Sequence, residues 1–302
     1  MFRLAHISDV HLGPLPHVPI RQLFSKRITG FVNWHRNRRK HLFGNTLDLL
    51  IERIAAEAPD HLAVTGDLVN LATETEIDIA GRWLDALGEP ANISVVPGNH
   101  DAYVPGAAGR AARAWGPYMS ADGEPNATAL RFPYMRRRGD VALIGCSTAL
   151  ATPPFSANGY FGRRQARETL NLLAAAGEQG LCRVVMIHHP PIRGATADYK
   201  RMVGIRRFAA VLREAGAELV LHGHTHLNTL YRLDGRHGDV PVVGIASASQ
   251  GPGGRKPASS FNLFSIDGEP GRWEIRRQRF SMDDNALTFS LTADDRLNRV
   301  FA

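Results

Sequence analysis

The sequence predicts an α/β protein. Short, continuous apolar runs, typical of strands buried on both faces, alternate with segments whose apolar residues recur at helical spacing. After residue 226 the pattern changes to runs that alternate or are rich in β-branched and aromatic residues, which also favours strands. The chain has 302 residues and is 44% hydrophobic, which is enough to bury the core of a single α/β domain.

The predicted elements follow from these patterns in order along the chain. Continuous apolar runs predict strands at residues 3–8, 61–65, 93–96, 141–146, 183–187 and 218–221. Helical spacing predicts helices at residues 46–57, 74–87, 163–176 and 205–215. The last part predicts strands at residues 230–233, 240–245, 262–266 and 273–280, with turn residues at 267–271 joining the last two. The arginines at 136–138 and 163–164 are expected to be surface charge, and the Gly- and Pro-rich residues 251–257 predict a surface loop.

Five short polar clusters follow apolar runs, and together they predict a site for two metal ions. They are Asp9-Val10-His11, Gly66-Asp67, Gly98-Asn99-His100-Asp101, His188-His189-Pro190 and Gly223-His224-Thr225-His226. Carboxylate, imidazole and carboxamide groups hold first-row metals, and no cluster supplies a thiolate. One cluster alone would be weak evidence, but five in this order are not. Mixed nitrogen and oxygen ligands leave Mn, Fe, Zn and Co open.

The ordered set resembles that of the calcineurin-like metallophosphoesterase superfamily, whose pattern is D-x-H, G-D, G-N-H-[DE], H and G-H-x-H. The resemblance covers residues 9–226. It implies a ligand set in which Asp9, His11 and His226 bind one metal, Asn99, His188 and His224 bind the other, and Asp67 bridges both. His188 is preferred to His189 because the family places its ligand two residues before the proline, although the reverse assignment stays open. The implied fold is a sandwich of two mixed β-sheets packed face to face, flanked by helices, with the metals at one end.

The chemistry of these groups favours the same assignment. Two metal ions about 3.5–4 Å apart polarise a phosphoryl oxygen and lower the pKa of a bridging water, so that hydroxide can attack phosphorus in line. Asp67 suits a bridge because a carboxylate has two oxygens to share, whereas Asn99 offers one neutral carbonyl. His100 is then expected to protonate the leaving oxygen, with Asp101 orienting its ring. The alternative is that His100 and Asp101 only buttress the loop.

A basic amphipathic insertion at about residues 14–45 is the feature that the common fold explains least. Residues 10–47 contain no Asp or Glu, while the whole chain has a net charge of +7. The segment contains seven basic residues: Arg21, Lys26, Arg27, Arg36, Arg38, Arg39 and Lys40. Apolar residues recur beside them at helical spacing: Ile20, Leu23, Phe24, Ile28, Phe31 and Val32. Three interpretations stay open for Arg21–Lys40: docking on an anionic membrane surface, packing on the catalytic domain, and, less favoured, contact with nucleic acid.

These observations predict one catalytic domain, residues 1–302, that acts as a metal-dependent phosphoric ester hydrolase and more specifically as a phosphodiesterase. The insertion favours a phospholipid head group or another amphipathic phosphodiester as substrate. A cyclic-nucleotide phosphodiesterase is the alternative. A non-catalytic scaffold on the same fold is a rival of a different class, which the full ligand set argues against. A nuclease is disfavoured because no second domain for holding a duplex is evident.

The remaining features predict a cytoplasmic protein, attached peripherally at most to the inner membrane face. Cys146 and Cys182 lie in apolar runs, which is typical of reduced, buried thiols. No secretory signal is visible, because the first metal cluster begins at residue 9. No apolar stretch approaches the roughly 20 residues that a membrane-spanning helix needs.

Overall fold

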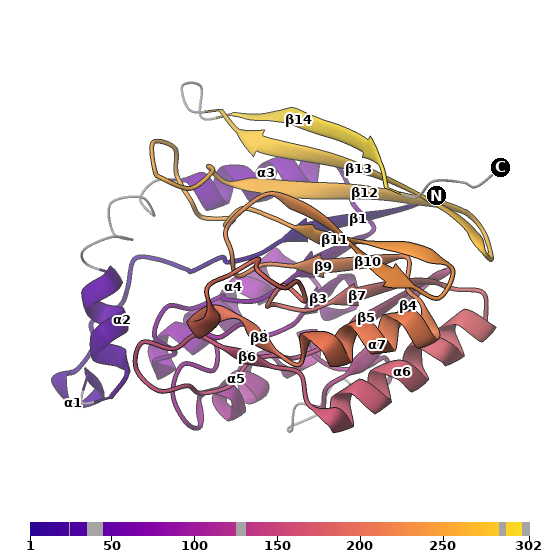
Figure 1. Cartoon of the computed structure of the whole chain (residues 1–302). Coiled ribbons are helices and arrows are strands. Elements are labelled where there is room, and N and C mark those ends of the chain that lie inside the picture. Colours follow the sequence, from indigo (N-terminus) through magenta and orange to yellow (C-terminus); the bar gives the residue numbers. More distant parts are fainter. Residues whose placement is uncertain (24, 35–44, 125–130, 284–287, 298–302) are drawn as a thin grey trace.

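Two six-stranded mixed sheets pack face to face, and helices cover their outer faces (Figure 1). The computed structural model describes residues 1–23, 25–34, 45–124, 131–283 and 288–297. The two packed sheets with flanking helices confirm the α/β sandwich that the resemblance implies.

The first sheet has the strand order β14-β13-β12-β1-β2-β3. Its strands are β1 (Phe2–Ile7), β2 (His61–Val64), β3 (Ile93–Val95), β12 (Ser260–Glu269), β13 (Arg272–Met282) and β14 (Phe289–Arg296). The strands β1, β2 and β3 run parallel to one another, while β12 pairs antiparallel with β1 and begins an antiparallel extension. The first three strands therefore end at the same edge of the sheet.

The second sheet has the order β10-β11-β9-β7-β5-β4. Its strands are β4 (Tyr134–Arg138), β5 (Val141–Gly145), β7 (Cys182–Met186), β9 (Leu219–His222), β10 (Thr229–Gly235) and β11 (Gly238–Gly244). The four central strands are parallel and the two outer strands are antiparallel. A small parallel pair, β6 (Gly159–Tyr160) and β8 (Met202–Val203), lies apart from both sheets.

Helices cover the outer face of each sheet. The first sheet packs against α3 (Thr46–Ala56), α4 (Glu74–Leu87) and α5 (Ala107–Trp115), and the second against α6 (Arg163–Glu178) and α7 (Ile205–Ala215). The short 3₁₀ helices are η2 (Pro90–Asn92), η3 (Gly116–Tyr118) and η4 (Asp198–Lys200). Strand alternation builds separate apolar layers: Leu4 of β1 packs between the sheets, whereas its neighbour Ala5 packs in the layer that also contains Leu50 of α3.

The strands and the four helices predicted from the sequence are present, with small shifts at their ends. The helix α5 and the strands β4, β6, β8 and β14 were not predicted. The prediction of surface charge at residues 136–138 is wrong for Arg136, which is buried. Its guanidinium donates to the carbonyls of Ser120, Pro90 and Ile93 at 2.6–2.7 Å, and these bonds offset the cost of burying the charge.

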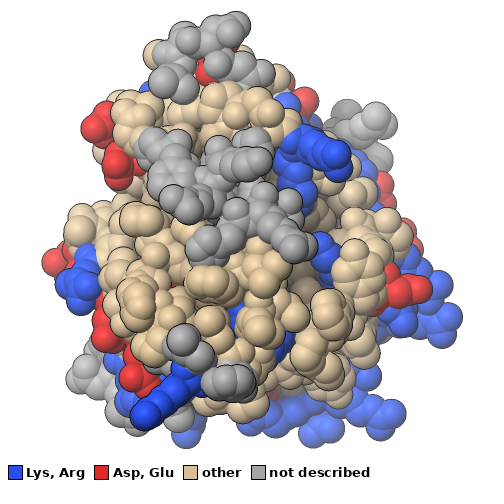
Figure 2. All heavy atoms as spheres, turned by 90° about the vertical axis from the view of Figure 1, so that its left-hand side faces the viewer, with Lys and Arg blue, Asp and Glu red and all other residues tan. Residues whose placement is uncertain are grey.

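The insertion begins with two short helices, α1 (Ile20–Leu23) and α2 (Arg27–Asn33). Phe24 and residues 35–44, including Arg36, Arg38, Arg39 and Lys40, lie outside the described residues. On the face that carries α1 and α2, the acidic side chains that are coloured lie near the margins, and most of the coloured side chains toward the centre are uncharged (Figure 2). Among the helices of the described ranges, none is long and apolar enough to cross a membrane. Cys146 and Cys182 are buried free thiols, as predicted.

Candidate metal centre

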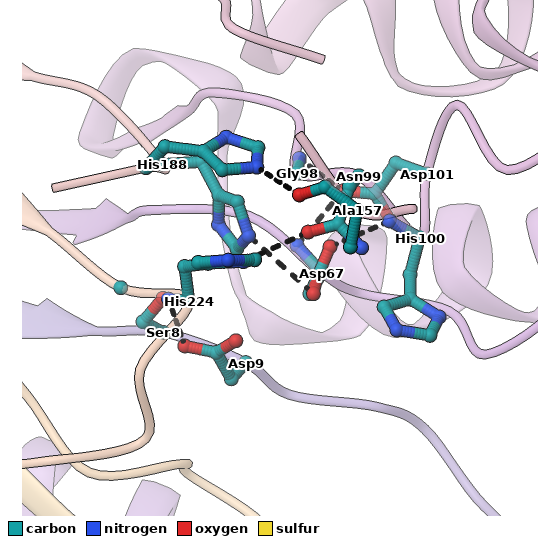
Figure 3. Close-up of polar contacts among 12 residues, drawn as sticks. Ser8, Asp9, Asp67, Gly98, Asn99, His100, Asp101, Ala157, His188 and His224 are labelled. Carbon is teal, nitrogen blue, oxygen red and sulfur yellow. Dashed lines mark hydrogen bonds and ion pairs between the residues drawn. The ribbon is translucent and has the colours of Figure 1, made fainter. Parts of the chain in front are cut away.

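The predicted ligands lie in loops that follow the parallel strands of both sheets. Asp9 and His11 follow β1, Asp67 follows β2, and Asn99 follows β3. His188 follows β7, and both His224 and His226 follow β9. Because the carboxyl ends of parallel strands share one edge, clusters far apart in the sequence meet at one end of the sandwich (Figure 3).

The backbone bends sharply at most of these positions. Five candidate ligands adopt the left-handed conformation that non-glycine residues rarely use: Asp9 (φ 53°), His11 (41°), Asp67 (57°), His224 (68°) and His226 (55°). Such conformations cost on the order of 1–3 kcal/mol each and gather at functional sites. The loops also approach closely, since a Cβ atom at Gly98 would lie 2.1 Å from Asp67 Oδ1. The glycine of the G-N-H motif is therefore needed for the loops to meet.

The side chains form two main groups of converging ligand atoms, each within 4.8 Å. One group is Asp9, His11 and His226, and the other is Asp67, His188 and His224. Asn99 joins the second group, because its Oδ1 lies 2.9 Å from His224 Nδ1. The structure therefore brings the seven predicted ligands together in the two sets that the resemblance implies. Asp67 lies between them, because it also forms a third group with His11 and His100.

Backbone carbonyls fix the orientation of two imidazoles. The Nδ1 atom of His188 donates to the Thr65 carbonyl at 2.6 Å, and that of His11 donates to the Val69 carbonyl at 3.1 Å. A carbonyl can only accept, so Nδ1 carries a proton and Nε2 has the lone pair when the ring is neutral. Burial lowers the pKa of His188, but Asp67 outweighs this effect and raises it to about 9, so a metal bound at Nε2 would displace a proton. These two Nε2 atoms lie 3.4 Å and 3.8 Å from Asp67 Oδ2. Each ring thus presents a metal-binding nitrogen beside the same carboxylate.

The environment of His224 tests whether a cation fits. Its Nε2 donates to the Lys200 carbonyl at 2.9 Å. Burial, together with the neighbouring His189 and His188, holds the pKa of His224 well below its usual range, so the ring is neutral. Its Nδ1 therefore carries a lone pair, and this lone pair faces the Asn99 carboxamide oxygen 2.9 Å away. Two acceptor atoms cannot hydrogen-bond to each other, but both can bind the same cation. In addition, His188 Nε2 is buried without a hydrogen-bond partner among the described residues, and Asp9 Oδ1 lies 3.1 Å from His226 Nε2 in the other ligand group. The donor set fits two metal ions.

His100 lies beside both groups. Its Nδ1 donates to the Asn70 carbonyl at 2.5 Å, and its backbone N–H donates to Asp67 Oδ1 at 2.8 Å. The ring stacks on Tyr103, with centroids 5.1 Å apart. Because Nδ1 is on the carbonyl, Nε2 is the ring nitrogen that would offer or take a proton at the centre.

Asp101 has a different role from the predicted one. Its carboxylate accepts four backbone N–H groups, from Asp67 (2.9 Å), Leu68 (2.8 Å), Val69 (3.2 Å) and Gly98 (2.8 Å). The prediction that Asp101 orients the His100 ring is wrong, because the Asn70 carbonyl holds that ring at Nδ1. Asp101 instead ties the loop of Asp67 to the loop of Asn99, which is the alternative of a buttress.

The His188-His189 pair divides into two positions. Both ring nitrogens of His189 are engaged, with Nδ1 2.7 Å from Thr148 Oγ1 and Nε2 3.0 Å from the Ala157 carbonyl. His188 faces Asp67, while His189 anchors the loop at residues 147–158.

Lys256 donates to the Thr225 carbonyl at 2.7 Å, which places the loop at residues 251–257 beside the G-H-x-H cluster.

The sequence did not identify Lys26 and Tyr103 as neighbours of the centre. The Lys26 Nζ lies 4.7 Å above the Tyr103 ring, and burial lowers the pKa of Lys26 to about 8. Arg27 donates to the carbonyls of Leu71 (3.0 Å) and Ala72 (2.6 Å), next to Asn70. The only sequence signals were the position of Tyr103 after the G-N-H-D cluster and the basic insertion. The insertion therefore contacts the loop that carries His100.

Comparison with known proteins supports this description. The family described as calcineurin-like phosphoesterase matches residues 2–228. The structure is similar to a dimetal phosphatase from Danio rerio, with a TM-score of 0.62, 12% identity and 98% of each chain covered. It is also similar to a purple acid phosphatase from yellow lupin (Lupinus luteus) seeds, with a TM-score of 0.59, 12% identity, and 97% of this chain and 53% of that chain covered. At these identities the likeness shows the fold alone. No curated protein matches the chain.

Proposed function

The chain belongs to the calcineurin-like phosphoesterase family, and we propose that it is a dinuclear-metal phosphodiesterase that acts on an amphipathic phosphodiester. One observation carries the hydrolytic part of the proposal. Asp67 lies between two groups of ligand atoms, and His100 stands beside it with Nδ1 held by a backbone carbonyl. This is the arrangement that a two-metal hydrolase with a separate proton donor needs.

The roles of the residues follow from their positions. Two bound metal ions would supply Lewis-acid activation of the phosphoryl group and hydroxide near neutral pH. Asp9, His11 and His226 would hold one ion, Asn99, His188 and His224 the other, and Asp67 both. His100 would protonate the leaving oxygen through Nε2. Tyr103 and the Asn70 carbonyl keep its ring in place.

The charge around the centre favours a diester over a monoester. A phosphomonoester carries close to two negative charges at neutral pH, whereas a diester carries one. Lys26 lies close enough to Asp67 for that carboxylate to oppose the effect of burial, which lowers the pKa of Lys26 to about 8. Among the described residues, Lys26 thus places one positive charge near the centre, which suits the single negative charge of a diester.

The insertion favours a substrate with an apolar part. The helix α2 directs Lys26 and Arg27 toward the centre, while Ile28 and Val32 on the same helix remain exposed. A phospholipid, with its diester beside acyl chains, would match this combination. Peripheral attachment at the inner membrane face is part of the same proposal.

A substrate panel tests the proposal. Protein loaded in turn with Mn, Fe, Zn or Co should hydrolyse bis(4-nitrophenyl) phosphate faster than 4-nitrophenyl phosphate, and should release a head group from dispersed phospholipid. Hydrolysis of cyclic nucleotides without action on lipid would favour the alternative substrate class. Metal-loaded protein that hydrolyses no ester would favour a scaffold.

A further inference from the structure

We propose that the face around the metal centre docks on an anionic lipid bilayer through an apolar rim. The rim consists of Ile28 and Val32 of α2, Leu150 and Phe155 of the loop between β5 and β6, and Tyr199 of η4. Delivery of a lipid substrate to the centre rests on the proposed function, but the docking itself does not.

The rim exposes large apolar side chains that a soluble surface would be expected to bury. Phe155 is 83% exposed, Tyr199 55% and Ile28 53%, and Val32 and Leu150 are also exposed. Phe155 has a φ of 65°, an unusual backbone conformation for a bulky residue. Its turn is closed by the Ser156 N–H, which donates to the Pro153 carbonyl at 3.2 Å. A ring held outward at a strained turn is expected where it meets a partner.

Hydrogen bonds join the three segments of the rim. Lys26 donates to the Ser156 carbonyl at 2.7 Å, which links α2 to the loop of Phe155. The Ala157 N–H donates to the Tyr199 carbonyl at 2.8 Å, which links that loop to η4. The rim therefore behaves as one surface although its residues are far apart in the sequence.

Two further hydrogen bonds place the rim beside the metal centre. His189 donates to the Ala157 carbonyl, and His224 donates to the Lys200 carbonyl, each from Nε2. Ala157 is two residues from Phe155, and Lys200 is next to Tyr199. A surface on which the rim rested would therefore lie next to the ligand groups.

The charge of the rim segments matches an anionic surface. Residues 20–34, 147–158 and 189–204 contain six basic residues and one acidic residue: Arg21, Lys26, Arg27, Arg193, Lys200, Arg201 and Asp198. Asp198 pairs with Arg201 at 3.4 Å. Exposed Arg21, Arg193 and Lys200 would stand close to lipid phosphates while the apolar side chains enter the interface. A nucleic acid would match the charge but not the aliphatic side chains of Ile28, Val32 and Leu150.

Vesicle flotation tests the docking. The parent protein should float with vesicles of phosphatidylcholine and phosphatidylglycerol in equal parts, and not with phosphatidylcholine alone. Phe155→Asn keeps a residue that tolerates positive φ and should weaken binding by roughly tenfold or more, because one buried aromatic ring is lost. Tyr199→Ser should have a similar effect. Leu291→Ser is the matched control, because Leu291 is 48% exposed on the edge strand β14, outside the rim.

Two further measurements keep the outcome decisive. Metal content and melting temperature should be the same in Phe155→Asn and the parent, so that loss of flotation cannot reflect misfolding. Phe155→Trp should gain indole emission that vesicles with brominated acyl chains quench. The parent floating with neither vesicle, or Leu291→Ser losing as much binding as Phe155→Asn, would overturn the proposal. So would a parent that shifts a duplex oligonucleotide but does not float.

Different results would contradict the docking and the proposed function. Flotation of the Asp67→Ala variant, which should lack metal, would show docking without catalysis. Hydrolysis of bis(4-nitrophenyl) phosphate by a parent protein that does not float would leave the function and remove the docking.

Discussion

The Tyr103 ring stacks on the His100 imidazole, with centroids 5.1 Å apart and planes inclined by 12°. Lys26 lies over the same tyrosine, and a Cβ atom at Gly30 would come within 2.6 Å of the Tyr103 hydroxyl oxygen. The helix α2 therefore packs closely on the residue that supports His100. The insertion, whatever it binds outside, contributes to the position of the proposed proton donor.

Replacing Tyr103 should impair proton donation without removing metal. In Tyr103→Leu the ring of His100 loses its stacked neighbour, and we expect turnover of an alkyl phosphodiester to fall by roughly 10–100-fold, the range found for residues that orient a reactive group. Hydrolysis of a nitrophenyl diester should fall much less, because that leaving group needs little protonation. Tyr160→Leu, at an exposed ring on β6, is the control. Equal losses on both substrates would assign Tyr103 a purely structural role.

His100→Ala should retain both metals and slow turnover of an alkyl diester by roughly 10²–10⁴-fold, which is the usual contribution of a general acid. The effect should again shrink for nitrophenyl leaving groups. Metal analysis of the purified variant beside steady-state rates on both substrates provides the check. A variant that has lost metal would show that His100 is a ligand, as its place in a group with His11 and Asp67 would allow.

Asp67→Ala should remove more metal than any other ligand substitution, because Asp67 lies between the two ligand groups. Asn99→Ala provides the comparison, since Asn99 contacts His224 of the second group and should leave the first group with its metal. Elemental analysis of each variant after identical loading measures the difference. If Asp67→Ala kept one full equivalent of metal, the bridging role would be untenable.

The sequence indicated the candidate ligands because each polar cluster follows an apolar run, and the resemblance then assigned the residues within each cluster. Strands such as β1 and β7 are buried on both sides and therefore read as continuous apolar segments, after which His11 and His188 stand out. The order of the strands within each sheet was not predictable in this way. The resemblance supplied two mixed sheets packed face to face but no strand order, since the apolar pattern does not say which strands are neighbours.

The errors concern side chains whose partners are distant in the sequence. Arg136 is polar, yet it is buried because the carbonyls of Pro90 and Ile93 are brought to it by folding. Asp101 follows His100 directly, which suggested a contact, but its carboxylate points to the backbone of the loop that carries Asp67 and Val69. β14 was missed because its sequence is mostly polar, as an edge strand permits.

The two thiols should be unreactive in the folded protein. Burial raises the pKa of Cys146 to about 12 and that of Cys182 well above its usual range, so both stay protonated at pH 8, where an exposed thiol with a pKa of about 8.5 would be partly ionised. A disulfide reagent should therefore react slowly with native protein and rapidly after unfolding in urea. Titration of free thiols over time measures this. Fast labelling of one native thiol would contradict the buried position.

Asp101→Asn distinguishes a role of Asp101 in tying two loops together from a role in orienting the His100 ring. In Asp101→Asn an amide NH₂ replaces one oxygen and faces backbone N–H donors, either those of Asp67 and Gly98 or those of Leu68 and Val69. Two buried donors would lose their acceptor, so the free energy of unfolding should fall by about 3 kcal/mol, and metal affinity should fall with it. Urea denaturation with and without metal measures both effects. Asp122→Asn is the control, because Asp122 also accepts a backbone N–H, from Arg137, but at an exposed position. The free energy of unfolding should change little in this variant. If Asp101→Asn were as stable as the parent and lost only the turnover of poor leaving groups, Asp101 would act on His100 after all.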